Sequence, residues 1–345
     1  MAEGASSSRH IEVRPDWLAL RVEAALEPDL PIVDAHHHFH DRSTTRYLLD
    51  DLVADMGAGH NIRATVYVQS TGMGYRTTGD PAFASVGEAE FANRIATTKV
   101  SGHQGPVHVC AGIVGYADLA LGSRVRPVLE ALIVAGGGHF RSIRDSLVWD
   151  EQGHLNARGP ARNGRMRNPS FREGFACLAP LGVLFDAWVY HPQLDELADF
   201  ARAFPETQFV LNHMGGPVHI ASYAGRRAEI FAQWAAGMRR LSGCPNVTVK
   251  LGGIGMNYGG FGFHEQAMPP SSQMLCDAWR PYVETCIEAF GTKRCMFESN
   301  FPVDKGTCSY AVVWNAFKRM VGGASDAEKA DLFSGTAARV YRLAI

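Results

Sequence analysis

The sequence predicts an α/β protein, a (β/α)8 TIM barrel built as a single domain. Two observations support this prediction: eight short β-rich runs recur along the 345 residues, and a helical pattern follows each run. Several runs are apolar almost throughout, which is typical of parallel strands that are covered on both faces. The expected strands span residues 31–36, 62–69, 107–114, 139–144, 182–189, 207–212, 246–252 and 293–298.

An open, doubly wound sheet is the rival arrangement. It is disfavoured because no Gly-rich phosphate-binding fingerprint follows the first expected strand. A chain of 345 residues also suits one barrel domain. We therefore expect an N-terminal extension at 1–29 and a single barrel domain at 30–345.

Helix boundaries are indicated by short polar patterns. Ser85 with Glu88 has the spacing of a capping box, and Ser325 with Glu328 repeats it near the C-terminus. Ser123 is expected to open another helix, which the glycines at 136–138 end.

Two connections are long, at 145–167 after the fourth strand and 253–271 after the seventh. Both would lie at the C-terminal rim of the barrel, where active sites of this fold are built. The first contains the basic run "ARNGRMRN" at 161–168, which is either a solvated loop or a lid that meets an anionic substrate. The glycine-rich, aromatic stretch 252–263 either closes over a ring-shaped substrate or only lets the backbone turn.

Composition and charge exclude several classes of partner. The chain is 46% hydrophobic and 20% charged, with a formal net charge of −2, so no global field attracts it to nucleic acid or to an anionic membrane. Its seven cysteines form no C-x-x-C pair, "MAEGASSSRH" lacks the apolar core of a signal peptide, and no apolar run is long enough to span a bilayer. We expect a cytoplasmic protein with a small-molecule substrate; a homo-oligomer is compatible with this sequence.

The stretch "PIVDAHHHFHD" at 31–41 places four histidines in five positions. Side chains two apart on a strand point the same way, so His36 and His38 are expected to face the barrel mouth. His37 and His40 would pack or hydrogen-bond around them. Histidine is both an acid–base group near neutral pH and a common metal ligand, so this pair is a candidate catalytic element.

Polar residues at the other expected strand ends would join this pair, because the carboxyl ends of parallel strands meet at one end of a barrel. Arg144 and Lys250 suit an anionic or strongly polar substrate, or else form an ion pair inside the barrel. The candidate catalytic residues are His36, His38, His213, Glu298, Asn300 and Asp304. The candidate substrate-binding residues are Gln69, Arg144, Tyr190, His191, Lys250 and His264.

Four motifs, in chain order, resemble the amidohydrolase superfamily: "IVDAHHHF", "VLNHMGGP", "VKLGG" and "FESNFPVDK". They are most similar to its amidohydrolase-2 branch, which holds the sugar-acid lactonases and 2-pyrone-4,6-dicarboxylate lactonase. The resemblance runs from about residue 30 onward. It implies a barrel whose site uses a first-strand H-x-H pair, a sixth-strand histidine and an eighth-strand aspartate. In this sequence the three histidines are His36, His38 and His213.

Asn300 departs from the pattern that the resemblance implies. The eighth-strand motif commonly reads S-D-W-P or T-D-W-P, whereas this chain has S-N-F-P. An amide cannot take a proton from water, although its oxygen can still bind a ligand. Three explanations stay open: Asp304 or Glu298 acts as the base, a histidine does, or the chemistry is no longer hydrolysis.

A metal ion is the second open question. His36, His38 and His191 would supply three nitrogen ligands to one Zn²⁺ and leave a fourth position for water, as in many catalytic zinc sites. A bound zinc would lower the pKa of that water and polarise a carbonyl group. The resemblance also includes metal-independent lactonases, in which histidine and arginine polarise the carbonyl directly.

The favoured function is a hydrolase that opens a cyclic ester (lactone) of a polar or anionic small molecule. His36 and His38 would polarise the carbonyl, with or without zinc, while an eighth-strand carboxylate or His213 takes a proton from the attacking water. One alternative is a metal-dependent, non-oxidative decarboxylase of an aromatic or unsaturated acid. A second alternative is a barrel that binds a ligand without turning it over.

Overall fold

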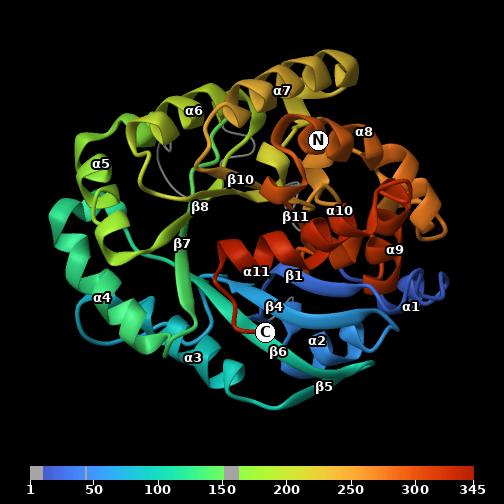
Figure 1. Ribbon diagram of the computed structural model, residues 1–345, viewed down its shortest axis with the longest axis horizontal. Helices are drawn as coiled ribbons and strands as arrows, with labels where there is room; N and C mark the ends of the chain where they lie inside the picture. Colours follow the sequence, from blue (N-terminus) through green and yellow to red (C-terminus); the bar gives the residue numbers. More distant parts are fainter. Residues whose placement is uncertain (1–10, 43–44, 151–162) are drawn as a thin grey trace, which may run out of the picture.

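The computed structural model describes residues 11–42, 45–150 and 163–345, and it confirms the predicted barrel (Figure 1). Eight parallel strands follow one another in the order β1-β4-β6-β7-β8-β9-β10-β11, and a bridge between His37 and Phe301 joins the two ends. Short β5 (Val100–Gly102) pairs antiparallel with β6, and β2 (His40–Arg42) with β3 (Thr45–Tyr47). The barrel strands are β1 (Pro31–His37), β4 (Asn61–Val68), β6 (Gly105–Gly115), β7 (Phe140–Ser146), β8 (Leu184–Trp188), β9 (Phe209–Leu211), β10 (Val247–Leu251) and β11 (Cys295–Phe297).

Helices surround the strands, except for α11, which crosses the middle of the ring in Figure 1. Each of the eight predicted strands overlaps an observed one, because buried parallel strands are continuously apolar. The helices are α1 (Pro15–Leu18), α2 (Leu49–Met56), α3 (Val86–Ala96), α4 (Arg126–Ala135), α5 (Pro169–Phe175), α6 (Leu194–Ala203), α7 (Arg227–Ser242), α8 (Ser272–Phe290), α9 (Tyr310–Met320), α10 (Asp326–Ala330) and α11 (Thr336–Val340).

The predicted capping boxes have different outcomes. Ser325 caps α10 together with Glu328, as expected. The prediction for Ser85 is wrong: its side chain does not cap α3, and its hydroxyl donates to the carbonyl of Tyr116. Glu88 is buried and accepts hydrogen bonds from Tyr67 and Ser70, so tertiary partners replace the local cap.

The helix expected to open at Ser123 begins later. A 3-10 segment covers Leu119–Val125, and α4 starts at Arg126, where Pro127 occupies its first turn. Proline favours this position because its missing N–H has no partner there in any case. The helix ends at Gly136, the first of the predicted glycines.

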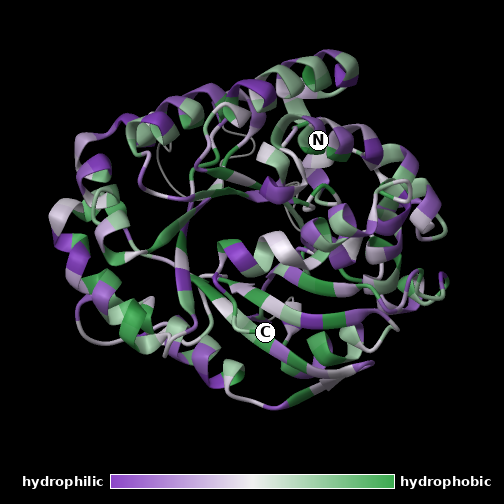
Figure 2. Cartoon of the chain, in the orientation of Figure 1, coloured by the Kyte–Doolittle hydropathy of each residue, from purple (hydrophilic) through white to green (hydrophobic). Residues whose placement is uncertain are grey.

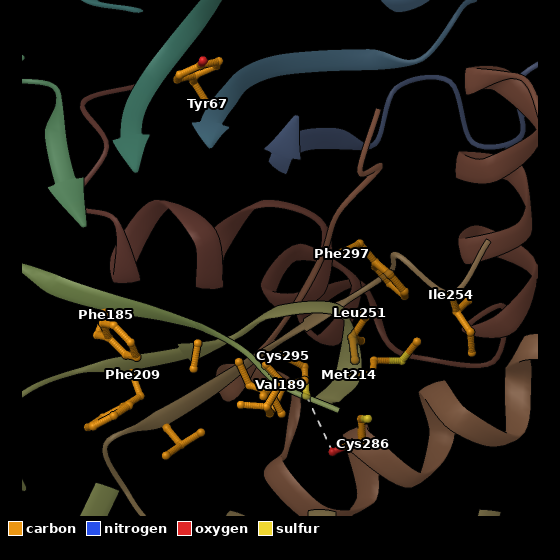
Figure 3. Packing of buried hydrophobic residues seen from close by; sticks show 14 of the residues in the cluster. Tyr67, Phe185, Val189, Phe209, Met214, Leu251, Ile254, Cys286, Cys295 and Phe297 are labelled. Carbon is orange, nitrogen blue, oxygen red and sulfur yellow. Dashed lines mark hydrogen bonds between the residues drawn. The ribbon is translucent and has the colours of Figure 1, made fainter. Parts of the chain in front are cut away.

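Apolar residues form two layers, which Figure 2 shows as green stretches on strands and on the helix faces that meet them. The outer layer, between strands and helices, includes Phe185 and Phe209, whose rings lie 5.9 Å apart (Figure 3). The inner layer fills one end of the barrel with small residues such as Val33 and Val66, and Tyr341 enters it from the segment after α11. Packed layers of this kind fix the strand ends, and therefore the site, in space.

The described part of the expected N-terminal extension packs against the barrel. Trp17 Nε1 donates to the carbonyl of Gln266 at 3.0 Å, and Lys318 Nζ donates to the carbonyls of Leu26 and Glu27. Residues 11–30 are thus held along α8, α9 and the long connection after β10. In the ranges that the structure describes, no helix is long and apolar enough to cross a membrane.

Asp34 joins the first barrel strand to the last. Its buried carboxylate accepts hydrogen bonds from the Ser299 hydroxyl (2.6 Å), the Ser299 N–H (2.9 Å) and the Tyr310 hydroxyl (2.9 Å). Across the same seam, the N–H of Asn300 donates to the carbonyl of His36. The seam therefore sets the position of the histidine motif relative to the end of β11.

His60 generates a prediction about acid stability. Its Nε2–H donates to the carbonyl of Ala311, and its Nδ1 accepts from Lys318 Nζ, so the ring is held neutral. Burial and the Lys318 charge lower its pKa to about 4. As the pH falls from about 6.5 to 4, the unfolded chain binds a proton at His60 before the folded protein does, so the free energy of unfolding decreases over this range. In His60→Gln, which can keep both hydrogen bonds, urea unfolding should show a shallower loss between these pH values. An unchanged slope would contradict the assignment.

Candidate active site

Three histidines and one glutamate converge at the carboxyl ends of β1, β9 and β11. The Nε2 atoms of His36 and His38 lie 3.0 Å apart, and the ring centroids of His36 and His213 are 4.6 Å apart. Glu298 contacts both His36 on β1 and His213 after β9: its Oε2 lies 2.8 Å from His36 Nδ1 and its Oε1 lies 2.7 Å from His213 Nδ1. All four side chains are at most 4% exposed. The convergence of His36, His38 and His213 is as the sequence predicted.

Local backbone features make room for Glu298 and His213. A Cβ on Gly252 would lie 2.5 Å from Glu298 Cγ, and a Cβ on Gly253 would lie 2.2 Å from His213 Nδ1. A side chain at either glycine of "VKLGG" would overlap Glu298 or His213, so both positions require glycine. His213 (φ 55°) and Asn300 (φ 56°) have left-handed backbones, which are uncommon outside glycine and are concentrated at functional sites.

A buried ion pair forms the floor of the cluster. Lys250 Nζ lies 2.9 Å from Asp186 Oδ2 and 3.4 Å from His36 Nδ1, and both charged side chains are fully buried. Asp186 also accepts from Ser142, Asn212 and Tyr341, so its oxygens are well satisfied. The structure therefore places Lys250 in an ion pair inside the barrel, which is the second of the two roles that the sequence left open for it.

Arg144 is the cationic side chain that borders the cluster and is partly exposed. Its Nη2 donates to the carbonyl of Gln69 at 2.7 Å, and its Nη1 lies 3.2 Å from His36 Nε2. Gln69 itself is buried at the end of β4, and its side-chain oxygen has no hydrogen-bond partner among the described residues. Arg144 can therefore place positive charge beside the histidines.

The electrostatic environment keeps the histidines neutral. Burial, followed by the charge of Lys250, holds the pKa of His36 well below its usual range, and burial and Arg144 do the same for His38. Burial also lowers the pKa of His213, although Glu298 opposes the shift. Neutral imidazoles can bind a metal ion or accept a proton.

The tautomers of the H-x-H pair fit a divalent metal. His38 Nδ1 lies 2.7 Å from the carbonyl of Val68, which can only accept, so this nitrogen carries the hydrogen. His36 Nδ1 lies 2.8 Å from Glu298 Oε2 and 3.4 Å from Lys250 Nζ, so either nitrogen of this ring can carry the hydrogen. With the hydrogen on Nδ1, the Nε2 lone pairs of His36 and His38 face each other across 3.0 Å. Zinc–nitrogen distances are about 2.0–2.1 Å, so two nitrogens at this separation can share one ion. Orientation of ligand histidines by a carboxylate and a carbonyl is common at metal sites.

A second grouping of potential ligand atoms shares His36. Among the described residues, atoms of His36, His213 and Glu298 lie within 4.8 Å of one another and could hold one ion. His191 belongs to neither grouping, which corrects its assignment as a zinc ligand: its Nδ1 accepts from the Val218 N–H, and its ring packs on Tyr223.

Asn300 and Asp304 form a separate unit beside the cluster. Asn300 Nδ2 donates to Asp304 Oδ1 at 2.8 Å, and Gly255 N donates to Asp304 Oδ2 at 3.1 Å. Burial raises the pKa of Asp304 to about 8, so it holds a proton at neutral pH. This geometry assigns Asp304 to holding Asn300 and the connection after β10 rather than to taking a proton from water.

An aromatic wall lies beside His213. The ring of Trp188 meets His213 edge-on at 4.6 Å and packs against Tyr190 and Tyr258 at 5.5 Å each. Trp188 is half-buried and the two tyrosines are buried. His264, by contrast, lies at the rim in a short 3-10 turn, Phe263–Glu265, and is not part of the cluster. The wall gives the site one apolar side.

The basic run has a structural role where it is described. Arg165 Nε lies 2.8 Å from Asp145 and its Nη2 lies 2.8 Å from Asp118, and Arg167 pairs with Glu196. Residues 161 and 162 of the run lie outside the described ranges. Arg165 therefore ties the connection after β7 back to the barrel instead of standing free for a substrate.

Four residues that shape the site were missed by sequence reasoning: Asp34, Asp186, Trp188 and Tyr341. A signal existed for two of them, because Asp34 and Asp186 are charged residues inside otherwise apolar strands. A buried charge requires a partner, so each predicts a polar network. Trp188 and Tyr341 gave no comparable signal.

Closed parallel strands with a histidine–carboxylate cluster at their carboxyl ends place this cluster where (β/α)8 barrels build their active sites. The chain belongs to the amidohydrolase family, whose sequence profile matches residues 33–343.

Relatives support this membership at moderate to low identity. The uncharacterized protein y4mH of Sinorhizobium fredii is 32% identical over 340 residues, covering 91% of this chain and 99% of that protein. An L-fucono-1,5-lactonase of Burkholderia multivorans is 27% identical, covering 68% of this chain and 72% of the lactonase. A crystal structure of a Burkholderia multivorans amidohydrolase with bound zinc aligns with a TM-score of 0.69 at 24% identity, covering 91% and 99% of the two chains, and thus shares the fold.

The buried pair Asp186–Lys250 generates a stability prediction. Lys250→Met should reduce the free energy of unfolding by about 3 kcal/mol, because Asp186 is left as an uncompensated buried charge. The double variant Asp186→Asn/Lys250→Met should recover part of this loss, since neither charge remains. Urea denaturation of the wild type, both single variants and the double variant gives the coupling energy. Simple additivity of the two single losses would show that the pair is not coupled.

Proposed function

We propose that this protein is a lactonase: it opens the cyclic ester of a polar or anionic small molecule by attack of an activated water. The observation that carries the proposal is Glu298, whose Oε1 is hydrogen-bonded to His213 Nδ1 at 2.7 Å and whose Oε2 lies 2.8 Å from His36 Nδ1, beside the cationic Arg144. The likeness to L-fucono-1,5-lactonases supports the same reaction class. The half-buried Trp188 offers an apolar surface for one face of a substrate ring.

In this mechanism His213 is the base, with Glu298 as its orienting partner. Glu298 accepts from Nδ1–H, so the lone pair of neutral His213 is on Nε2 and takes a proton from water. The resulting hydroxide attacks the lactone carbonyl, and Arg144 stabilises the oxyanion. Protonated His213 then gives its proton to the ring oxygen as the C–O bond breaks, which restores the neutral imidazole and releases a hydroxy acid.

A divalent metal fits the same residues. His36 and His38 would hold it through their Nε2 atoms, and Glu298 would orient His36. When bound, such an ion polarises a carbonyl group and lowers the pKa of an attached water.

A panel of five- and six-membered sugar-acid lactones tests the reaction class. We expect at least one to gain the mass of a water and release acid. In Glu298→Gln, kcat/KM should fall roughly 10- to 100-fold, because His213 and His36 lose their orienting carboxylate. Glu130→Gln, on the exposed face of α4, removes the same charge and should keep full activity. Normal turnover by Glu298→Gln would show that the Glu298–His213 pair is not part of the mechanism.

The same panel distinguishes the alternatives. Release of CO₂ from aromatic acids, with no lactone opening, would replace hydrolysis by decarboxylation. Lactones that bind without any change in mass would instead indicate a non-catalytic barrel.

Metal analysis after dialysis against zinc tests the ligand set. We expect wild-type protein to retain a divalent ion and His36→Gln to lose it, since His36 belongs to both possible ligand groups. His191→Gln should retain the ion. Loss in the His191 variant with retention in the His36 variant would reverse the assignment.

A further inference from the structure

We propose that a small anion with several charged oxygens binds in a second site, a basic pocket at the amino end of the barrel. The pocket has a volume of about 410 Å³, which lies within the range of small-molecule sites. Its walls come from residues that precede or begin β8, β9, β10 and β11 and from the end of α11 and the residues after it. The charged lining residues are Lys293, Arg294, Arg339, Arg342 and Glu206.

The pocket lies at the opposite end of the strands from the histidine cluster. Gly182 and Val183 lead into β8, Gln208 precedes β9, and Lys293 and Arg294 precede β11. The catalytic side chains project from the carboxyl ends of the same strands. A ligand in this pocket therefore does not occupy the position of the substrate.

The positive charge in the pocket is not neutralised by the protein. Within the described residues, none of its four basic side chains lies within 4.0 Å of a carboxylate. Several exposed arginines elsewhere are paired with a carboxylate, such as Arg126 with Glu130 at 3.0 Å and Arg240 with Asp195 at 2.6 Å. Four basic residues against one lining glutamate leave an excess of positive charge in one concave site, which attracts anions.

Backbone carbonyls hold the guanidinium groups in place. Arg294 donates to the carbonyls of Ser242 and Cys244, and Arg342 donates to that of Gly182. Arg339 donates to the carbonyl of Lys293. Carbonyl groups are neutral, so these contacts orient the cations without compensating their charge. Cations fixed in this way lose little side-chain entropy when a ligand binds.

A fifth cation adds to the field behind the pocket. Burial and the charge of Arg342 lower the pKa of Arg141, whose Nε donates to the carbonyl of Tyr341. The charges of Arg141 and Arg342 repel each other, and a bound anion would relieve this repulsion. The guanidinium fork matches anions that present two oxygens, which favours phosphate, phosphate monoesters and polycarboxylates over chloride.

Anion titration of the full-length protein tests the proposal. Sodium phosphate, glycerol 2-phosphate and citrate are added separately, with sodium chloride keeping the ionic strength constant, because screening alone alters exposed charges. At least one of them should raise the Tm in a saturable way, since a ligand that binds only the folded state stabilises it. Calorimetric titration gives the Kd, and the anion with the lowest Kd identifies the ligand type.

Two double variants locate the binding site. Lys293→Gln/Arg342→Gln removes two pocket charges and should weaken binding about tenfold or more. Arg94→Gln/Arg124→Gln removes the same charge from exposed positions on α3 and just before α4, outside the pocket lining, and should bind like the wild type. Circular dichroism and the Tm without added anion show whether the pocket variant is folded. Equal binding by both variants, or no saturable effect of any anion on the wild type, would overturn the proposal.

Discussion

The carboxylate of Asp34 is the contact on which the site depends. It fastens β1 to the segment after β11 by accepting three hydrogen bonds from Ser299 and Tyr310. His36 and His38 lie on one side of this seam and Glu298 on the other, so closure of the barrel and assembly of the site are one event. Because the carboxylate is fully buried, water could not take its place if it were removed, and the Ser299 and Tyr310 donors would be left without an acceptor.

Below the histidines, the interior of the barrel is polar where a simple core would be apolar. Asp186, Lys250 and Tyr341 link three distant parts of the chain, and Lys250 places a positive charge against His36. The same Tyr341 belongs to the segment whose flanking arginines line the basic pocket. The two ends of the barrel are thus joined through one short stretch after α11.

Much of the fold could be predicted because its signal is local. Apolar runs mark buried strands, and H-x-H spacing on a strand fixes which histidines share a face. Contacts between distant strands left no such signal. Glu88 has the spacing of a helix cap but accepts bonds from Tyr67 and Ser70 instead, and His191 lies at a strand end but turns toward Val218. Lys250 was expected either at the substrate or in an ion pair, and only the register of β8 beside β9 and β10 brings Asp186 to it.

Trp188 also gives the protein an internal optical reporter. Trp234, Trp279 and Trp314 are fully buried in the packed layers, whereas Trp188 is half-buried with its indole edge-on to His213. Indole fluorescence responds to the polarity of its surroundings. Occupation of the barrel mouth should therefore change the emission of Trp188, and replacing the other half-buried indole, Trp149, by Phe isolates that signal.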